Sequence, residues 1–410
     1  MAELQMPEAI VFDSVKDSEL NSPLVKIYGL TVFERTLKSL ESAEISNIKV
    51  FADKNFDAFD NLIKKHNWKC DLQLLEKSAF SPEINKPTLI LSEPLLITPR
   101  YIKEIIEAGQ RKETFATDPN GYVAFLSDKI IAGGLQYKSN LNETIKAIEV
   151  EGIKRTKADS IGRIVCEPVP DKKSRKQAVG RLIRSLRQPS DEFISRTFNR
   201  PISLFITRYI TGHTPITANQ FTLFTGVMGL ITAFILSLGG DKNFLIGGIM
   251  FHFLAVLDAG DGEIARLKFL ASERGQWIDT IVDNITYVAT LGGLIVGVFR
   301  SDPSNFVIYS SIAGVIFLVL ALLSLYIYLI KYNRGGSLVN IDYDFKDDTG
   351  WYGKIMDVLQ ELGRRPFFSI VFMFLGIFGI MEFSLVYVSI MTFFIFAYSI
   401  QAHIRAAQKS

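Results

Sequence analysis

The sequence predicts a protein of two parts, an N-terminal α/β domain followed by an α-helical domain with six membrane spans. Charged residues recur every few positions up to about residue 215, and long stretches without any charge follow. Within the first 150 residues or so, short β-branched runs alternate with amphipathic segments, a pattern typical of a mostly parallel α/β sheet. The overall 48% hydrophobic and 21% charged residues are therefore an average over two different kinds of domain.

The α/β prediction depends on four apolar runs and two segments with helical periodicity. Each run has the length and the β-branched content of a buried strand, and each segment repeats apolar residues at a spacing of three or four. The expected strands are 9–12, 47–52, 88–92 and 122–127, and the expected helices are 32–44 and 97–109.

Six segments beyond residue 215 are apolar enough to cross a membrane, where a bilayer leaves only helices as the plausible form. Residues 218–239 and 304–330 carry no charge at all. Residues 366–404 carry Glu382 as their only formal charge and predict a hairpin of two spans. The remaining two spans, 243–257 and 277–298, flank a cluster of acids.

The charge distribution also predicts how the chain is divided and oriented. The start of the chain lacks a basic leader before an apolar core, and the loop after the fourth span is rich in Lys and Arg. We therefore expect a multi-pass protein of the cell membrane, with the N-domain, the C-terminus and the acid cluster on the cytoplasmic side. The expected parts are a cytoplasmic domain (1–153), a basic linker (154–192), and an interfacial helix with the membrane domain (193–410).

Whole-chain charge and cysteine content exclude some classes of protein. A net charge of +2 gives no reason to expect nucleic-acid binding. Two cysteines cannot form a disulfide framework or a multi-cysteine zinc site.

Four aspartates at the ends of two successive spans form the most informative pattern. Asp258 and Asp261 lie three residues apart on one helix end, and Asp279 and Asp283 lie four apart on the next. The short connection between them allows antiparallel neighbours, so that the four carboxylates can converge. Clustered carboxylates repel unless they bind cations, and oxygen-only ligands select Mg²⁺, Mn²⁺ or Ca²⁺. Because Mg²⁺ commonly completes its shell with phosphate oxygens, the pattern predicts a phosphorylated substrate.

Small and basic residues accompany these acids. Gly262 and Ala265 would let a base and ribose lie against the helix, and Arg266 can donate to a phosphate. Gly275 allows a sharp entry into the next span. Together these residues predict a metal-dependent site for a diphosphate-linked nucleotide at the membrane surface.

This segment resembles the CDP-alcohol phosphotransferases, also called class I CDP-alcohol phosphatidyltransferases. It matches their signature, D-x2-D-G-x2-A-R-x8-G-x3-D-x3-D, at all eight fixed positions, and the resemblance covers about residues 195–410. It implies that a CDP-linked donor loses CMP as an acceptor hydroxyl attacks its β-phosphorus, giving a phosphodiester. It also implies a homodimer in the lipid bilayer and two Mg²⁺ or Mn²⁺ ions. The metal ligands that it implies are Asp258, Asp261, Asp279 and Asp283, and Asp283 is also the general base. The residues that it implies for CDP binding are Gly262, Ala265, Arg266 and Gly275.

The opening of the chain resembles the sugar-nucleotide and CDP-inositol type nucleotidyltransferases, which have a Rossmann-like fold, in the runs AIVF, SPLVKIYGLTVFERTLKSL and NIKVF. In that family a glycine-rich loop with an arginine wraps the nucleotide phosphates. Here the loop at 13–21 has no glycine, and Asp13 and Asp17 would repel phosphate. Ser22 and Glu93 replace the lysine and the metal-binding aspartate of the family. We therefore expect an inactive domain.

The order of the two domains resembles the bifunctional enzymes that make CDP-inositol and condense it with inositol phosphate, the di-myo-inositol-phosphate-phosphate synthases. An inositol-phosphate product and a phospholipid product, the latter from a CDP-diacylglycerol donor, both stay open. Two further alternatives are a soluble domain that itself makes the CDP-alcohol, and a non-enzymatic ion pathway lined by the acids. The cytoplasmic cations that could bind a phosphate on the acceptor are Arg196, Arg200, Arg334, Arg364 and Arg365.

Overall fold

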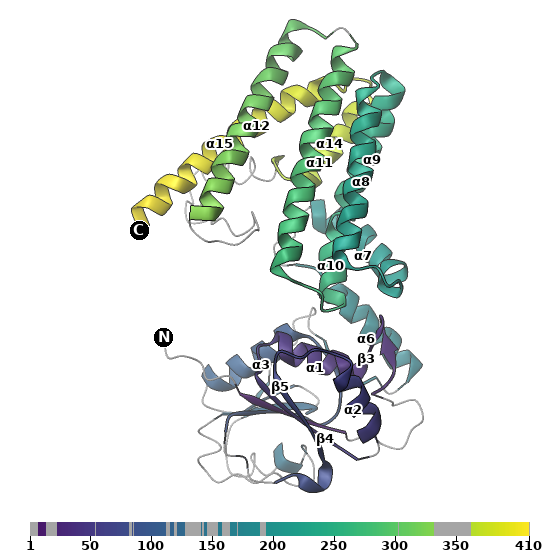
Figure 1. The fold of residues 1–410 in the computed structure, drawn as a ribbon, viewed down its shortest axis with the longest axis vertical. Coiled ribbons are helices and arrows are strands. Elements are labelled where there is room, and N and C mark those ends of the chain that lie inside the picture. The colour runs from purple at the N-terminus through teal and green to yellow at the C-terminus, as the bar shows by residue number, and fades with distance from the viewer. Residues whose placement is uncertain are drawn as a thin grey trace. The chain divides into compact units, whose positions relative to one another are not determined.

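The structure is a computed structural model of the chain, drawn in Figure 1. It divides into two compact units, Met1–Gln188 and Pro189–Ser410. The residues that it describes are 7–13, 23–53, 55–81, 84, 86–111, 115–118, 121–127, 141, 143–145, 155–157, 165–169, 171–188, 194–301, 303–331 and 362–409.

A seven-stranded sheet forms the centre of the N-terminal unit, with the order β10-β8-β9-β6-β1-β4-β5. Parallel pairing joins β1 to β4 and β6, β4 to β5, and β8 to β10, as the alternation of strands and helices predicts. The mostly parallel expectation misses β9, which is antiparallel to both of its neighbours. These strands are β1 (Glu8–Phe12), β4 (Asn47–Ala52), β5 (Asp71–Glu76), β6 (Thr88–Leu91), β8 (Phe115–Thr117), β9 (Val123–Leu126) and β10 (Arg155–Lys157).

Helices cover this sheet because alternate strand residues point to opposite faces. On one face Val11 and Val50 pack with Phe33 of α1, Phe59 of α2 and Tyr101 of α3. The opposite face carries a smaller core that includes Ile10, Ile90, Leu141 and Ile145. The helices and short pieces are α1 (Val32–Ser42), α2 (Phe56–Lys64), α3 (Pro99–Arg111), α6 (Lys172–Ser185), a 3-10 turn (Lys77–Ala79), β2 (Lys26–Ile27), β3 (Leu30–Thr31), β7 (Leu96–Ile97) and β11 (Cys166–Glu167).

The start of α1 is fixed by a capping box. The Thr31 side chain accepts from the Glu34 backbone N–H at 3.1 Å, and the Glu34 carboxylate accepts from the Thr31 backbone N–H at 2.7 Å. His66 also contacts this carboxylate, at 2.7 Å. The box satisfies backbone donors that a helix start otherwise leaves open.

Long apolar helices make up the C-terminal unit. Among the described residues, five stretches are long and apolar enough to cross a membrane: Ala218–Ser237, Asp241–Leu267, Glu273–Phe299, Asn305–Tyr328 and Phe383–Gln401. The helices are α7 (Arg200–Tyr209), α8 (Ala218–Ser237), α9 (Asp241–Leu257), α10 (Ala259–Leu267), α11 (Glu273–Phe299), α12 (Asn305–Lys331), α14 (Arg365–Ile377) and α15 (Phe383–Lys409).

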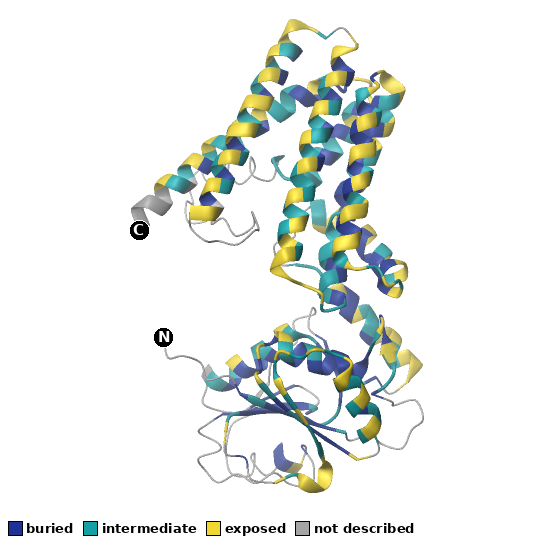
Figure 2. Cartoon of the chain, viewed as in Figure 1, coloured by how far each residue is buried: buried dark blue, intermediate teal, exposed yellow. Residues whose placement is uncertain are grey.

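The sixth predicted span corresponds to α14, which has only 13 residues. At a rise of 1.5 Å per residue it is about 20 Å long, less than the roughly 30 Å of a bilayer core. The structure therefore establishes five candidate spans and one shorter apolar helix. Apolar residues remain exposed along these helices, for example Phe306, Ile316 and Ile330 on α12, as expected of surfaces that face lipid (Figure 2).

Close helix packing in this unit depends on glycine. A Cβ atom at Gly293 of α11 would lie 2.1 Å from the Ala233 carbonyl oxygen of α8, and one at Gly248 of α9 would lie 2.9 Å from the Phe372 carbonyl oxygen of α14. Larger residues would force these helices apart. α8 packs on both α9 and α11, the helices whose ends carry the acids.

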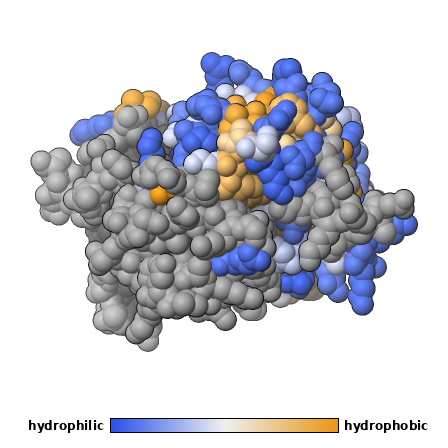
Figure 3. Space-filling view, turned by 90° about the horizontal axis from the view of Figure 1, so that it is seen from below, coloured by the Kyte–Doolittle hydropathy of each residue, from blue (hydrophilic) through white to orange (hydrophobic). Residues whose placement is uncertain are grey.

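Figure 3 shows the molecule from below, where hydrophilic side chains lie next to the hydrophobic surface that the described residues show.

Candidate functional site

The four aspartates of the signature come from two successive helical stretches. Asp258 lies where α9 passes into α10, and Asp261 lies in the first turn of α10. Asp279 and Asp283 lie near the start of α11, on one face of that helix. The Ser272 side chain caps this start by accepting from the Gly275 backbone N–H at 3.1 Å.

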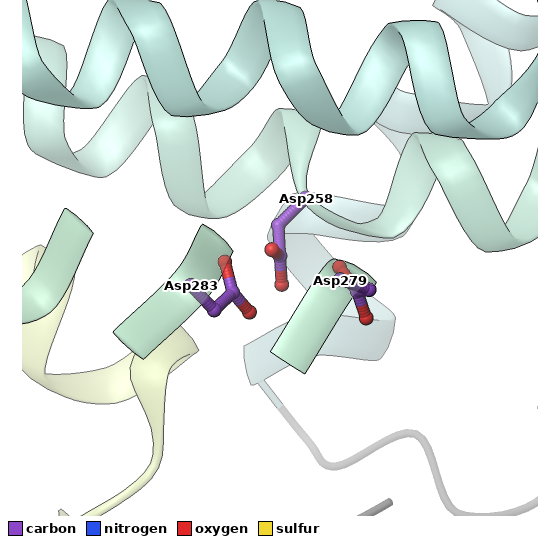
Figure 4. A group of neighbouring side chains, drawn as sticks. All are labelled: Asp258, Asp279 and Asp283. Atoms are coloured by element: carbon purple, nitrogen blue, oxygen red, sulfur yellow. The ribbon is translucent and has the colours of Figure 1, made fainter. Parts of the chain in front are cut away.

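Three of these carboxylates converge. Asp258, Asp279 and Asp283 each offer an oxygen atom, and the three oxygens lie within 4.8 Å of one another (Figure 4). Asp261 joins the group through a side-chain contact with Asp279. The structure thus brings together the four acids that the spacing predicts, while their individual roles stay predictions.

A threonine and a backbone amide orient Asp261. Thr222 Oγ1 of α8 donates to one carboxylate oxygen at 2.7 Å, and the Gly262 backbone N–H donates to the other at 2.5 Å. Partners of this kind fix the direction in which a ligating carboxylate points.

Arg365, the first residue of α14, lies among the acids. Its Nη1 donates to Asp258 and, at 2.9 Å, to Asp283, and its guanidinium carbon lies 5.0 Å from the centroid of the Tyr287 ring. The side chain is 9% exposed, and its buried Nε has no hydrogen-bond partner among the described residues. The cluster therefore contains one cation of the chain itself, with donor capacity left over.

The donor set of this cluster fits a hard divalent cation. It consists of carboxylate oxygens only, which suit Mg²⁺, Mn²⁺ or Ca²⁺ rather than metals that prefer nitrogen or sulfur. Clustered carboxylates repel one another, so a bound cation would stabilise the group.

The residues expected to bind CDP lie beside the acids. A Cβ atom at Gly262 would lie 3.2 Å from Nη1 of Arg266, so the arginine extends across the glycine on α10. A Cβ at Gly275 would lie 3.2 Å from the Asn219 side-chain oxygen and from the Ser272 hydroxyl oxygen. At both positions glycine therefore lets polar side chains of the chain itself approach the backbone closely.

The other predicted arginines are scattered. Arg196 is exposed in a π-helical turn (Ser195–Asn199), Arg364 is partly buried beside Arg365, and Arg334 lies outside the described residues. Arg200 of α7 is buried and pairs with Glu263 at 3.0 Å. Of the described arginines in the predicted set, Arg365 is the one with recorded contacts to the acids.

Reasoning from the sequence missed three residues of this region. Thr222 contacts Asp261, and Tyr287 contacts Arg365. Both are uncharged, so a search for charged residues does not find them. Glu263 is completely buried against α7. A polar repeat on α7, with Arg200, Ser203 and Thr207 on one face, is the signal that could have revealed its partner.

In the N-terminal unit, the predicted positions lie at the carboxyl ends of neighbouring strands. Asp13 follows β1 and accepts from the Asn55 side-chain amide at 3.0 Å, while burial raises the pKa of its carboxyl group. Glu93 follows β6, which pairs with β1. Asp17 and Ser22 lie outside the described residues. The expectation of an inactive domain stays a prediction.

Comparison with protein families identifies the C-terminal half. Residues 215–396 match the family model of the CDP-alcohol phosphatidyltransferases, a stretch that contains all four aspartates, the CDP residues and Arg365.

Comparison with characterised proteins finds three similar sequences, all with the name "Bifunctional IPC transferase and DIPP synthase". The one from Aquifex aeolicus is 22% identical over 318 residues, which cover 67% of this chain and 72% of the relative. The one from Thermococcus kodakarensis is 28% identical over 186 residues, 44% of this chain and 40% of the relative. The one from Archaeoglobus fulgidus is 36% identical over 93 residues, 23% of this chain and 18% of the relative. The matches thus span less than half of the length of two of these relatives.

Proposed function

We propose that this protein, whose residues 215–396 form a CDP-alcohol phosphatidyltransferase domain, moves a substituted phosphoryl group from a CDP-linked donor to an acceptor hydroxyl and releases CMP. The observation that carries the proposal is the convergence of Asp258, Asp279 and Asp283 within 4.8 Å inside that domain. An arrangement of acids from two helix ends has little use in a lipid-embedded domain unless it binds cations.

In this proposal the four acids have different roles in the reaction. Asp258, Asp261 and Asp279 would hold the metal, as two Mg²⁺ or Mn²⁺ ions, and Asp283 would also contact one of them. Bound metal neutralises charge on the diphosphate and on the leaving CMP. Asp283, as an ionised carboxylate, takes the proton of the acceptor hydroxyl while the oxygen forms a bond to the β-phosphorus. The bond between that phosphorus and the oxygen of CMP breaks, so the products are a phosphodiester and CMP.

Binding of CDP falls to residues of α10 and the start of α11. Arg266 would pair with the diphosphate, and the small residues Gly262, Ala265 and Gly275 would let the nucleoside lie against the helices.

Arg365 is the best candidate for a phosphate on the acceptor. It already touches Asp283, the proposed base, and its buried Nε has a hydrogen to donate. An anionic group that lies beside the base would satisfy this donor. Arg196, Arg334 and Arg364 are further candidates, whereas Arg200 is occupied by Glu263.

The N-terminal unit, in this proposal, does not transfer nucleotides. A second candidate function is favoured by the similarity to the Aquifex protein, which covers 67% of this chain and therefore reaches beyond the membrane domain. Under that alternative the soluble unit makes the CDP-alcohol that the membrane unit consumes, and the order of the two domains favours an inositol derivative as the alcohol.

The proposal includes a topology. The chain would be a homodimer in the cell membrane, with α14 as the sixth crossing and with the acids on the cytoplasmic side. The grouping of the acids at one end of the helices favours an enzyme over an ion pathway, which needs ionisable groups at several depths.

A CMP-release assay tests the proposal. The full chain in detergent with Mg²⁺ is offered CDP-diacylglycerol or CDP-inositol, each with a panel of alcohols and phosphorylated alcohols. We expect release of CMP with at least one pair and its loss when EDTA removes the metal. Absence of release with every pair, in a sample that is folded, would contradict the proposal.

A further inference from the structure

Glu263 is an acid of the signature segment with no part in the reaction proposed above. It lies between Gly262 and Ala265 in the sequence, and its side chain is completely buried. An ionised carboxylate is seldom buried without partners, because removal from water is costly. The partners of the Glu263 carboxylate therefore indicate its role.

All recorded partners of Glu263 come from α7. Arg200 Nη1 donates to Oε1 at 3.0 Å and the Ser203 hydroxyl donates to the same oxygen at 2.6 Å. The Thr207 hydroxyl donates to Oε2 at 2.6 Å. The three donors lie three and four residues apart, so they form one face of α7. Three donors on two oxygens fix both the position and the rotation of the carboxylate.

The far end of α10 is fastened to the segment after α7. The ammonium group of Lys268 donates to three carbonyl oxygens, those of Thr211 at 3.1 Å, Thr214 at 2.6 Å and Ile216 at 2.7 Å. Between the two attachments, Ile264 of α10 packs with Ile206 of α7. The helix is therefore held along its length on one side.

The opposite side of α10 faces the site. Its buried face consists of Gly260, Glu263, Ile264 and Leu267, whereas Asp261 and Arg266 belong to the other side. In an α-helix, residues two apart point in nearly opposite directions, so the Glu263 attachment lies behind Asp261. A rotation of α10 about its axis would move the proposed metal ligand and the proposed CDP ligand together.

We propose that Glu263 and Arg200 are positioning residues, which hold α10 on α7 and so place Asp261 and Arg266 for the CDP-linked donor. The inference rests on the function proposed above and assigns Arg200 to this ion pair rather than to an acceptor phosphate. Buried ion pairs can often be replaced by apolar residues without loss of stability, so stability alone gives weak reason for such a pair. Placement is a sufficient reason, because a shift of about 1 Å at a reacting group can cost about 100-fold in rate.

The same helix carries an apolar surface. Ile202, Phe205 and Tyr209 of α7 are exposed at helical spacing, and so is Phe198 of the preceding π-helical turn, as expected of a helix that lies in the membrane interface. The Glu263 contacts therefore connect the helix at the lipid surface with the helix that carries the signature. This connection would keep the site at a fixed depth relative to the headgroups of the membrane.

Two variants with a matched control test the proposal in the full chain. Glu263→Gln removes the charge, and the double variant R200M/E263L replaces the pair with apolar side chains that can pack in its place. The control is Glu273→Gln, which makes the same charge change at an exposed position in the first turn of α11. The measurements are kcat and KM of CMP release per folded molecule, CDP affinity by calorimetry with Mg²⁺, and thermal unfolding.

Both variants should lose at least about tenfold in kcat/KM and in CDP affinity, even where the double variant unfolds at the wild-type temperature. The control should match the wild type. A double variant with wild-type CDP affinity and kcat/KM would overturn the proposal, and so would a rise confined to the KM of the acceptor. A wild type that binds CDP without CMP release contradicts the proposed function only, since CDP affinity still decides the role of Glu263. A wild type that binds no CDP overturns both.

Discussion

Acidic side chains lie at the ends of regular elements in both units, but their surroundings differ. In the C-terminal unit, Asp258, Asp279 and Asp283 converge within 4.8 Å, next to a buried arginine. In the N-terminal unit, Asp13 accepts hydrogen bonds from Asn55, and burial raises the pKa of its carboxyl group. The acids of the first arrangement share one space, where a cation would stabilise them, whereas Asp13 takes its hydrogen bonds from Asn55. The number of acids that lie close together is therefore a better sign of a candidate site than the presence of an acid at the end of a helix or strand.

The largest effect should follow from removal of the proposed base. Asp283→Asn keeps the shape of the side chain but cannot accept the proton of the acceptor hydroxyl, so kcat should fall by about 10²- to 10⁴-fold. CDP binding in the presence of Mg²⁺, measured by calorimetry, should survive. Near-normal CMP release in this variant would remove Asp283 from the role of base.

A smaller effect should follow from removal of the hydroxyl that orients Asp261. Thr222→Val deletes the 2.7 Å hydrogen bond to its carboxylate without a large change of volume. The loss of such a partner commonly lowers metal affinity about 10- to 100-fold. Electron paramagnetic resonance of free Mn²⁺ measures this affinity. Thr225→Val is the control, because the Thr225 hydroxyl donates to the Thr222 carbonyl oxygen instead. Equal affinity in the two variants would show that the Thr222 contact is without effect.

The sequence predicted the convergence of the acids because the determinants of that convergence are local. Asp258 and Asp283 are 25 positions apart, and the two helix ends between them are joined by a short turn, so spacing alone brings the carboxylates together. The spans were equally visible, since a bilayer imposes a long absence of charge. The central strands β1, β4 and β6 followed from β-branched runs of the right length.

Contacts between distant parts of the chain were beyond this kind of reasoning. Arg365 reaches Asp283 from 82 residues away, and Arg200 reaches Glu263 from 63 residues away. Arg365 belongs to no sequence repeat, and the polar face of α7 that contains Arg200 does not show which acid it contacts. The direction of β9 was also missed, since hydrophobicity determines whether a strand is buried and not which way it runs. The 13 residues of α14 look like part of a longer span because the turn after them is apolar too.

A change in the soluble unit should affect its stability and leave the membrane site untouched. Burial opposes ionisation of Glu34, but hydrogen bonds from Thr31 and His66 outweigh it and lower the pKa of this carboxyl below its usual 4.5. Its contribution is therefore complete above pH 4.5 and is lost as the pH falls through the lower pKa of the folded state. Glu34→Gln keeps an acceptor for the Thr31 backbone N–H but removes the charge, so it should cost about 1 kcal/mol at pH 7, and the difference should shrink in acid.

Hydrogen exchange of residues 31–42 in the full chain, followed from pH 7 down to pH 4, measures this difference. CMP release serves as the control and should stay at the wild-type level. A parallel loss of CMP release would mean that the two units depend on each other for activity.

The smallest effect should follow from Asp13→Ala, and this variant also decides between the two candidate functions. If the soluble unit transfers no nucleotide, the wild type releases no pyrophosphate from CTP and a phosphorylated alcohol, and the variant leaves CMP release unchanged. Asp13 would then be only a partly buried strand-end carboxyl that accepts from Asn55. Pyrophosphate release by the wild type that disappears in the variant would instead make the soluble unit a working nucleotidyltransferase. The acids at the two ends of the chain would in that case serve consecutive reactions, in spite of the glycine-free loop.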